Sequence, residues 1–164
     1  MTVWVDADSC PRLVRNYLIR YTKKFNIPII FAANRQIPQP SSHLLFKMII
    51  CGEAKDSADN YITSNAEAQD IVITRDILLA DRLVKKSVTV LNDRGTVYSK
   101  ENIGRRLSER NLSLQFSQLG LIEHKKNNYG KEEFSKFAAG FDKEIQKLLK
   151  KAASVSEKPP QIGQ

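Results

Sequence analysis

The sequence predicts an α/β fold of three layers, with a mostly parallel sheet flanked by helices. The main observation is that short apolar, β-rich segments alternate with segments whose apolar residues recur at helical spacing. A second is size: the chain has 164 residues, 41% of them hydrophobic and 27% charged, which suits one domain with a real hydrophobic core. We therefore expect a single domain over residues 1–153.

The expected elements follow in order. Apolar, β-rich segments predict strands at 2–7, 27–32, 46–51, 70–74, 87–91 and 96–98. Helical periodicity predicts helices at 11–25, 56–67, 77–86 and about 100–110. Residues 34–42, with two prolines and two serines, predict a loop, and the NDRG segment at 92–95 predicts a turn.

The composition changes after residue 123. Residues 125–130 are a polar, turn-prone link, and residues 131–153 predict a long C-terminal amphipathic helix. Its apolar stripe consists of Phe134, Phe137, Phe141, Ile145, Leu148 and Leu149. Residues 154–164 contain two adjacent prolines and predict a disordered tail.

Several classes of protein are excluded by simple features. Two cysteines cannot build a disulfide framework, which favours a reduced, cytoplasmic setting. No apolar run approaches the roughly 18 residues of a membrane span. The opening MTVWVDAD places two carboxylates where the apolar stretch of a secretory signal would continue. We expect a soluble cytoplasmic protein that does not contact a membrane.

The net charge of +8 is unevenly distributed. Residues 1–81 hold 9 basic and 9 acidic side chains, whereas residues 82–164 hold 17 basic and 9 acidic. This asymmetry suggests a polyanionic partner such as nucleic acid. A solvated basic face that aids solubility is the alternative.

Acidic side chains follow the predicted strands of the first half. In a parallel sheet the carboxyl ends of the strands lie at one edge, where ligands bind. Carboxylates that converge there repel one another unless a divalent cation offsets the charge, and oxygen ligands favour Mg²⁺ or Mn²⁺. The candidate metal ligands are Asp6, Asp8, Asp56, Asp59, Asp76 and Asp81.

Most of these acids also have a structural interpretation. Asp8 and Asp56 could begin helices, and Asp76 could occupy the first turn after its strand. Asp81 could be a solvated helix residue. Asp6 directly ends an apolar strand and has no capping role to fill, so it is the strongest candidate.

Other reactive residues are weaker candidates. Cys10 resembles a phosphatase nucleophile, but its loop is one residue too short and nearby carboxylates oppose thiolate formation, so we expect a packing role. The two histidines, His43 and His124, have no plausible partner ligand, which argues against zinc. Arg75 and Arg94 lie beside a strand end and in a turn, where either could hold a phosphate or be an ordinary surface arginine.

Four ordered motifs, VDADSCPR, KDSADNYI, DIVITRDILLADRL and VLNDRG, resemble the uncharacterised bacterial YaiI/YqxD family over about residues 1–150. That family is usually placed by fold among the PIN-like nucleases. The resemblance implies a PIN-like sheet with an acidic, Mg²⁺-binding pocket at its edge. Asp93 stands where the family more often has proline, which we expect to alter the stiffness of the turn rather than the chemistry.

The PIN-like pattern also implies roles for individual acids. One acid follows the first strand, which matches Asp6, with Asp8 beside it. A second comes from a later helix, which matches Asp56 or Asp59, and a third follows a central strand, which matches Asp76. Asp81 fits the looser fourth position less well. The implied catalytic residues are Asp6, Asp59 and Asp76.

The leading hypothesis is a Mg²⁺- or Mn²⁺-dependent nuclease, a phosphodiesterase acting on RNA or single-stranded nucleic acid, with basic residues binding phosphates. One alternative is a non-catalytic RNA- or ribosome-associated binding protein. A haloacid-dehalogenase-type phosphatase is a weaker alternative: Asp6-Ala7-Asp8 resembles its nucleophile motif, but the downstream order of acids does not match.

Overall fold

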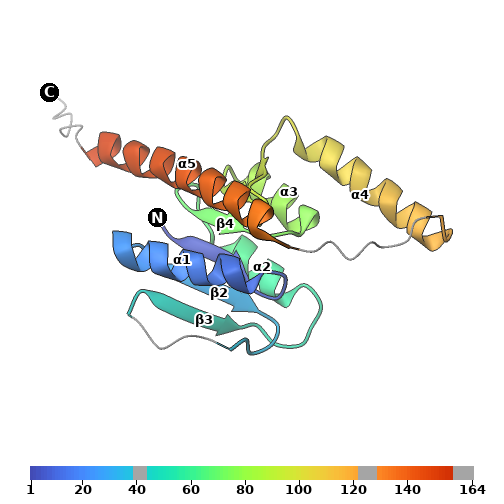
Figure 1. The fold of residues 1–164 in the computed structure, drawn as a ribbon, viewed down its shortest axis with the longest axis horizontal. Helices are drawn as coiled ribbons and strands as arrows, with labels where there is room; N and C mark the ends of the chain where they lie inside the picture. The colour runs from blue at the N-terminus through green and yellow to red at the C-terminus, as the bar shows by residue number, and fades with distance from the viewer. Residues whose placement is uncertain (39–43, 122–128, 157–164) are drawn as a thin grey trace, which may run out of the picture.

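A six-stranded sheet forms the centre of the protein, in the order β3-β2-β1-β4-β5-β6 (Figure 1). The computed structural model describes residues 1–38, 44–121 and 129–156. All neighbouring strands are parallel except β5 and β6, which are antiparallel. The predicted α/β fold with a mostly parallel sheet is therefore confirmed. The strands are β1 Val3–Asp6, β2 Ile29–Ala33, β3 Phe46–Ile50, β4 Ile71–Ile73, β5 Thr89–Leu91 and β6 Val97–Tyr98.

Helices cover both faces of the sheet and complete the three layers (Figure 1). Helices α1 and α5 pack on one face, and α2 and α3 on the other, with α4 against α3. Alternate residues of each strand face opposite sides, so Val3 and Val5 contribute to the first core cluster and Trp4 to the second. The helices are α1 Arg12–Phe25, α2 Ser57–Asn65, α3 Ile77–Lys85, α4 Ile103–Gln118 and α5 Lys131–Ser156.

The C-terminal amphipathic helix is part of the core. Phe137 and Phe141 of α5 are fully buried, and the ring of Phe141 packs edge-on against Tyr21 of α1, with centroids 5.2 Å apart. Tyr17 of α1 also packs edge-on against both phenylalanines. These contacts hold α5 on the sheet, as its apolar stripe predicted.

Two helix ends differ from the prediction. Helix α4 continues to Gln118 rather than ending near residue 110. The sequence did not predict this part of the helix, because the apolar residues at 111–118 do not recur at helical spacing and the segment is largely exposed. Gly120, at φ +71°, follows the end of this helix. Helix α5 runs through Ser156, three residues into the predicted tail. The remaining tail residues, 157–164, lie outside the described residues, as do 125–128 of the predicted link.

The strand order places a crevice at the carboxyl edge of the sheet. From β1 the chain crosses to β2 on one side, whereas β4, on the other side of β1, continues to β5. Ligands of open α/β sheets bind where the strand order reverses in this way. Across the described residues, no helix is both long and apolar enough to span a membrane.

Candidate active site

Asp6 lies at the reversal point between β1 and β4. The residue is only 7% exposed, and its Oδ2 accepts hydrogen bonds from the hydroxyls of Ser9, at 3.0 Å, and Thr74, at 2.8 Å. Thr74 directly follows β4, so this bond ties the carboxyl ends of two neighbouring strands together. Burial raises the pKa of Asp6, and the two hydroxyls oppose that rise. Within the described residues, no donor reaches its Oδ1.

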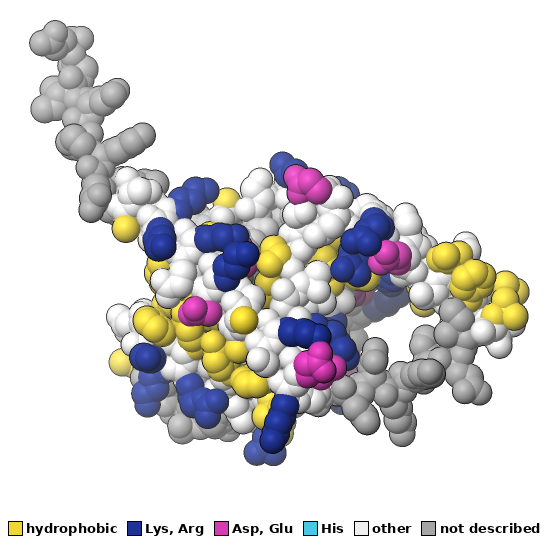
Figure 2. All heavy atoms as spheres, turned by 45° about the horizontal axis from the view of Figure 1, so that its top comes forward, with side chains coloured by type: hydrophobic (Ala, Val, Ile, Leu, Met, Phe, Trp, Pro, Cys, Tyr) yellow, Lys and Arg dark blue, Asp and Glu magenta, His cyan; other side chains and the backbone are white. Residues whose placement is uncertain are grey.

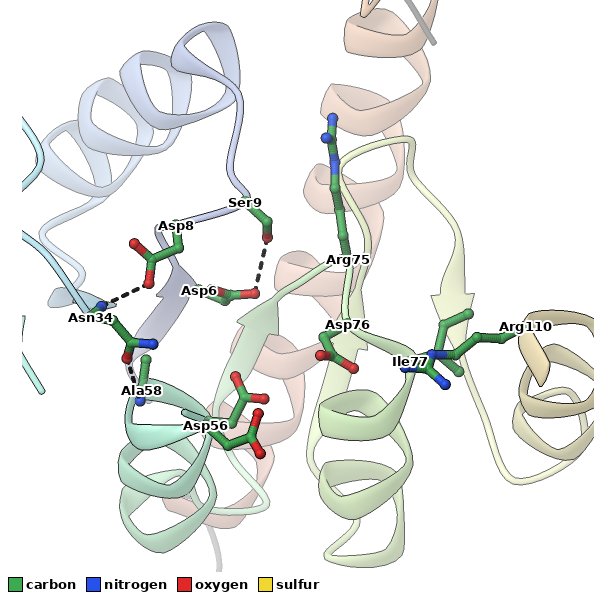
Figure 3. Close-up of a pocket in the computed structure, with 11 residues that line it drawn as sticks. Asp6, Asp8, Ser9, Asn34, Asp56, Ala58, Arg75, Asp76, Ile77 and Arg110 are labelled. Carbon is green, nitrogen blue, oxygen red and sulfur yellow. Dashed lines mark hydrogen bonds between the residues drawn. The ribbon is translucent and has the colours of Figure 1, made fainter. Parts of the chain in front are cut away.

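An open cavity of about 570 Å³ lies above Asp6 (Figure 3). Five of the six aspartates predicted as metal ligands line it, together with Arg75 from the loop after β4 and Arg110 from α4. The acids come from the end of β1 and the loop after it, from the start of α2 and from the start of α3, so segments far apart in sequence meet here. The lining residues used below are Asp6, Asp8, Asp56, Asp59, Asp76, Arg75 and Arg110.

Asn34, which follows β2, links two walls of the cavity. Its backbone N–H donates to Asp8 Oδ2 at 2.7 Å, and its side-chain Oδ1 accepts from the Ala58 N–H at 3.0 Å (Figure 3). The loop after β1 is thereby coupled to the first turn of α2. The sequence pattern predicts a loop at Asn34 and indicates no role for it. Its only signal was a polar residue directly after a strand.

Asp76 caps a helix with one carboxylate oxygen and leaves the other oxygen available for a ligand. Its Oδ1 accepts from the backbone N–H groups of Leu78, at 2.7 Å, and Leu79, at 3.3 Å, so it caps α3. The capping interpretation is confirmed for this residue, yet Oδ2 has no donor among the described residues. Asp56 is different: it occupies the position before α2 at φ +61° and makes no side-chain capping bond.

The pKa of Asp59 shows the effect of the neighbouring carboxylates most clearly. Its pKa rises from 3.8 to about 6, through burial first and then through repulsion by Asp6, Asp76 and Asp56. Arg82 opposes the rise weakly. The acids therefore share one electrostatic environment although they are not in contact.

In the absence of divalent cations, we expect Asp59→Asn to raise the free energy of unfolding at about pH 7.5 by about 1–2 kcal/mol. The folded-state pKa of about 6 lies above the ordinary 3.8, so ionising Asp59 lowers stability as pH rises through this interval. Well below pH 3.8 the carboxyl is protonated in both states and the advantage of asparagine disappears. Urea unfolding followed by circular dichroism measures both values.

The control for this experiment is Glu53→Gln, which removes an exposed carboxylate that does not line the cavity. We expect its effect to stay within about 0.5 kcal/mol at both pH values. An Asp59→Asn protein that is less stable than wild type at neutral pH would contradict the electrostatic account.

Arg75 lies at the rim and is held by a buried partner. Its Nε donates to Asp93 Oδ2 at 2.6 Å, and its Nη2 bonds the same oxygen. Asp93 is 2% exposed, and the hydroxyl of Tyr129 donates to its carbonyl at 2.6 Å. Asp93 therefore does more than alter the stiffness of the turn, because it orients a cavity arginine.

Two predicted site residues lie elsewhere. Asp81 does not line the cavity, and its Oδ2 pairs with Lys85 Nζ one helical turn along α3, at 2.6 Å. Arg94 pairs with Glu133 of α5 at 3.5 Å and does not line the cavity either. Burial raises the pKa of Cys10, so its thiol stays protonated at neutral pH, as a packing role requires.

Arg110, which the sequence analysis did not single out, lines the opposite side of the cavity. It comes from α4 and extends toward Ile77 (Figure 3). No carboxylate lies within 4.0 Å of it in the described part of the chain. The helical periodicity of α4 carried no signal for this placement, because it depends on how α4 packs against α3.

The aspartates that line the cavity are spread around its wall rather than grouped in a compact cluster. Within residues 1–38, 44–121 and 129–156, no three His, Cys, Asp or Glu side chains are grouped closely enough to hold a metal ion. The aspartates nevertheless present oxygen donors to one cavity, and oxygen is the donor that Mg²⁺ and Mn²⁺ prefer. The donor set thus fits a hard divalent cation in its chemistry.

Comparison with known proteins gives the family. The model of a family described as uncharacterized BCR, YaiI/YqxD family, matches residues 4–147. The chain belongs to this family. The matched segment contains the cavity aspartates, Arg75, Asp93 and Arg110, and extends into α5.

Curated relatives match over nearly their whole lengths. A UPF0178 protein of Treponema denticola is 42% identical over 150 residues, which are 92% of this chain and 95% of the relative. UPF0178 proteins of Psychromonas ingrahamii and Geobacter metallireducens are 40% and 35% identical, covering 92% and 95% of this chain and 99% and 100% of theirs. No solved structure shows a significant match to this chain.

Proposed function

We propose that this protein is a metal-dependent phosphodiesterase that cleaves RNA or single-stranded nucleic acid. The observation that carries the proposal is the group of five aspartates around one open cavity, at the reversal point of a parallel sheet. Burial, together with repulsion from Asp6, Asp76 and Asp56, already raises the pKa of one of them, Asp59, to about 6. Keeping several carboxylates around one cavity favours a compensating positive charge, which a divalent cation would supply.

The residues that would hold Mg²⁺ or Mn²⁺ are Asp6, Asp59 and Asp76, with Asp8 and Asp56 beside them. Such a cation, when bound, activates a water molecule and stabilises the leaving oxygen of the phosphodiester. Two of these acids each have one carboxylate oxygen that is not used in a hydrogen bond to the described part of the protein. Asp6 uses only Oδ2 in its hydrogen bonds, and Asp76 uses only Oδ1, so each retains a second oxygen for a ligand.

The remaining residues position the reacting groups. The Ser9 and Thr74 hydroxyls fix the orientation of Asp6, and the Asn34 bonds keep the wall formed by α2 in place. Arg75 and Arg110 at the rim offer positive charge to the phosphates of the substrate. They reduce the repulsion between the acidic cavity and a polyanion.

The basic surplus of the chain fits a nucleic-acid substrate. Figure 2 shows Lys and Arg side chains spread over the visible face among fewer acidic ones, rather than gathered into one patch. Contacts from such Lys and Arg side chains to the phosphate backbone would carry no recognition of base sequence.

The test is incubation of the purified protein with end-labelled single-stranded RNA, in Mn²⁺, in Mg²⁺ and in chelator. We expect cleavage only with a divalent cation. Salt-dependent RNA binding without cleavage under any of these conditions would contradict the proposal and favour a non-catalytic RNA-binding protein.

The cation itself can be tested without an activity assay. A ligand that binds only the folded state stabilises it, by about 2.7 kcal/mol at a hundredfold excess over its dissociation constant. We expect Mn²⁺ to raise the melting temperature of the wild-type protein and to have little effect on Asp59→Asn. An equal rise in both proteins would place the cation outside the cavity.

A further inference from the structure

A second cavity adjoins the acidic one. It measures about 300 Å³ and lies beside α3 and α4, with Asn92, Tyr98, Arg106 and Ser113 in its walls. Ile77 and Arg110 line both cavities, so the two adjoin at the start of α3. An extended molecule whose reacting group lies among the aspartates could therefore reach the second cavity across Ile77.

The chemical character changes along that path. The first cavity holds five aspartates, whereas the second holds one carboxylate, Glu109. Glu109 is shared by two arginines: its carboxylate lies 3.6 Å from Arg105 and 3.4 Å from Arg106. Arg110 has no carboxylate partner in the described ranges, and its one hydrogen bond is to Asn111 at 3.4 Å. The second cavity therefore carries a net positive charge.

Arg106 supplies a further sign of a missing acceptor. Its Nε is buried and has no hydrogen-bond partner among the described residues. A buried donor left without an acceptor costs about 1–3 kcal/mol, so such groups are rare in folded proteins. A small shift of the Arg106 side chain toward a phosphate oxygen in the cavity would give this donor an acceptor and remove that penalty.

We propose that this second cavity is a subsite for the nucleotide next to the scissile phosphate, and that Arg106 and Arg110 hold the neighbouring phosphate. The inference rests on the proposed function, because the substrate strand must pass from the acidic cavity over Ile77. A phosphodiester chain is the ligand that places one phosphate among the aspartates and offers another to the arginines.

The subsite would contact the sugar-phosphate backbone of the nucleic acid rather than its base. Tyr98 is the one aromatic residue in its walls and is 7% exposed, so it offers no open ring on which a base could stack. Guanidinium groups bind phosphate in a bidentate manner whatever the base. We therefore expect binding at this subsite to be tolerant of sequence.

The experiment measures binding of a fluorescently labelled single-stranded RNA of about eight nucleotides by anisotropy, in chelator so that no cleavage occurs. We expect Arg110→Ala and Arg106→Ala each to weaken binding about 10-fold. Each should also reduce the slope of log affinity against log salt by about 0.7, the value for one lost phosphate contact on a single strand.

Arg105→Ala is the matched control. Arg105 lies on the same helix, pairs with the same Glu109 and is 66% exposed, but it lines neither cavity. We expect its removal to change affinity less than about twofold. Arg106→Lys keeps the charge with fewer donors and should give an intermediate loss, which separates a specific contact from a folding defect.

The outcomes separate the subsite from the proposed function. Loss of affinity in Arg106→Ala and Arg110→Ala but not in Arg105→Ala supports the subsite, even if the protein cleaves nothing. Cleavage of RNA with unchanged affinity in those two variants leaves the function standing and overturns the subsite. An equal loss of affinity in all three variants also overturns the subsite, because such a loss would depend only on the net charge of the protein.

Discussion

Replacing Asp6 with asparagine is expected to reduce Mn²⁺-dependent cleavage of single-stranded RNA by at least about 100-fold while the protein stays folded. Asparagine has the shape of aspartate, and its oxygen can still accept from Ser9 and Thr74. The other carboxylate oxygen, which has no donor among the described residues, becomes an amide group without charge or affinity for a cation. Burial already raises the pKa of Asp6, so neutralising it should not lower stability.

Asp70 provides the matched comparison, because it is also a buried aspartate beside β1 and β4 but lies at the opposite edge of the sheet. It accepts from the Thr2 N–H at 2.7 Å, the Trp4 indole at 3.0 Å and the Glu67 N–H at 3.0 Å. Asp70→Asn cannot keep all three bonds, so we expect a loss of about 1–3 kcal/mol in stability with cleavage nearly unchanged. Comparable cleavage by wild type and Asp6→Asn would contradict the proposed role of Asp6.

Replacing Gly95 with alanine is expected to destabilise the protein by about 2–4 kcal/mol, the largest stability effect that we predict. Gly95 has φ +82°, and a Cβ atom there would lie 2.3 Å from the carbonyl oxygen of Lys136 in α5. Neither backbone can move without separating α5 from the turn at 92–95. Thermal unfolding should show a fall in melting temperature of roughly 5–15 °C.

Gly104→Ala is the control, because a Cβ at Gly104 in α4 meets nothing within 4 Å. Alanine is the better helix former there, so we expect a gain of up to about 1 kcal/mol. A Gly95→Ala protein as stable as wild type would show that the approach between the turn and α5 is looser than the structure indicates.

The same turn connects α5 to the candidate active site. Gly95 packs against α5, while Asp93, two residues earlier, pairs with Arg75 at the rim of the acidic cavity. Tyr129, just before α5, bonds the carbonyl of Asp93. The C-terminal helix, far from the cavity in sequence, thus helps to orient one of its arginines.

Local sequence patterns predicted most of the fold. Each strand and helix of the first half begins or ends within a few residues of its predicted bounds, because alternation and helical spacing report directly which side of an element is buried. The prediction was wrong at the end of α4, where residues 111–118 form a largely exposed helix. Exposure removes the apolar stripe on which such a prediction depends.

The sequence by itself determined the alternation of strands and helices and the position of Asp6, Asp59 and Asp76 on one edge. Parallel connectivity brings successive strand ends to the same side, so chain order alone predicts that neighbourhood. The tertiary structure decided that Asp81 lies outside the cavity, that Arg75 pairs with Asp93, and that Arg110 enters from α4. Those placements depend on how α3, α4 and α5 pack, and contacts between distant segments leave no periodic signal in the chain.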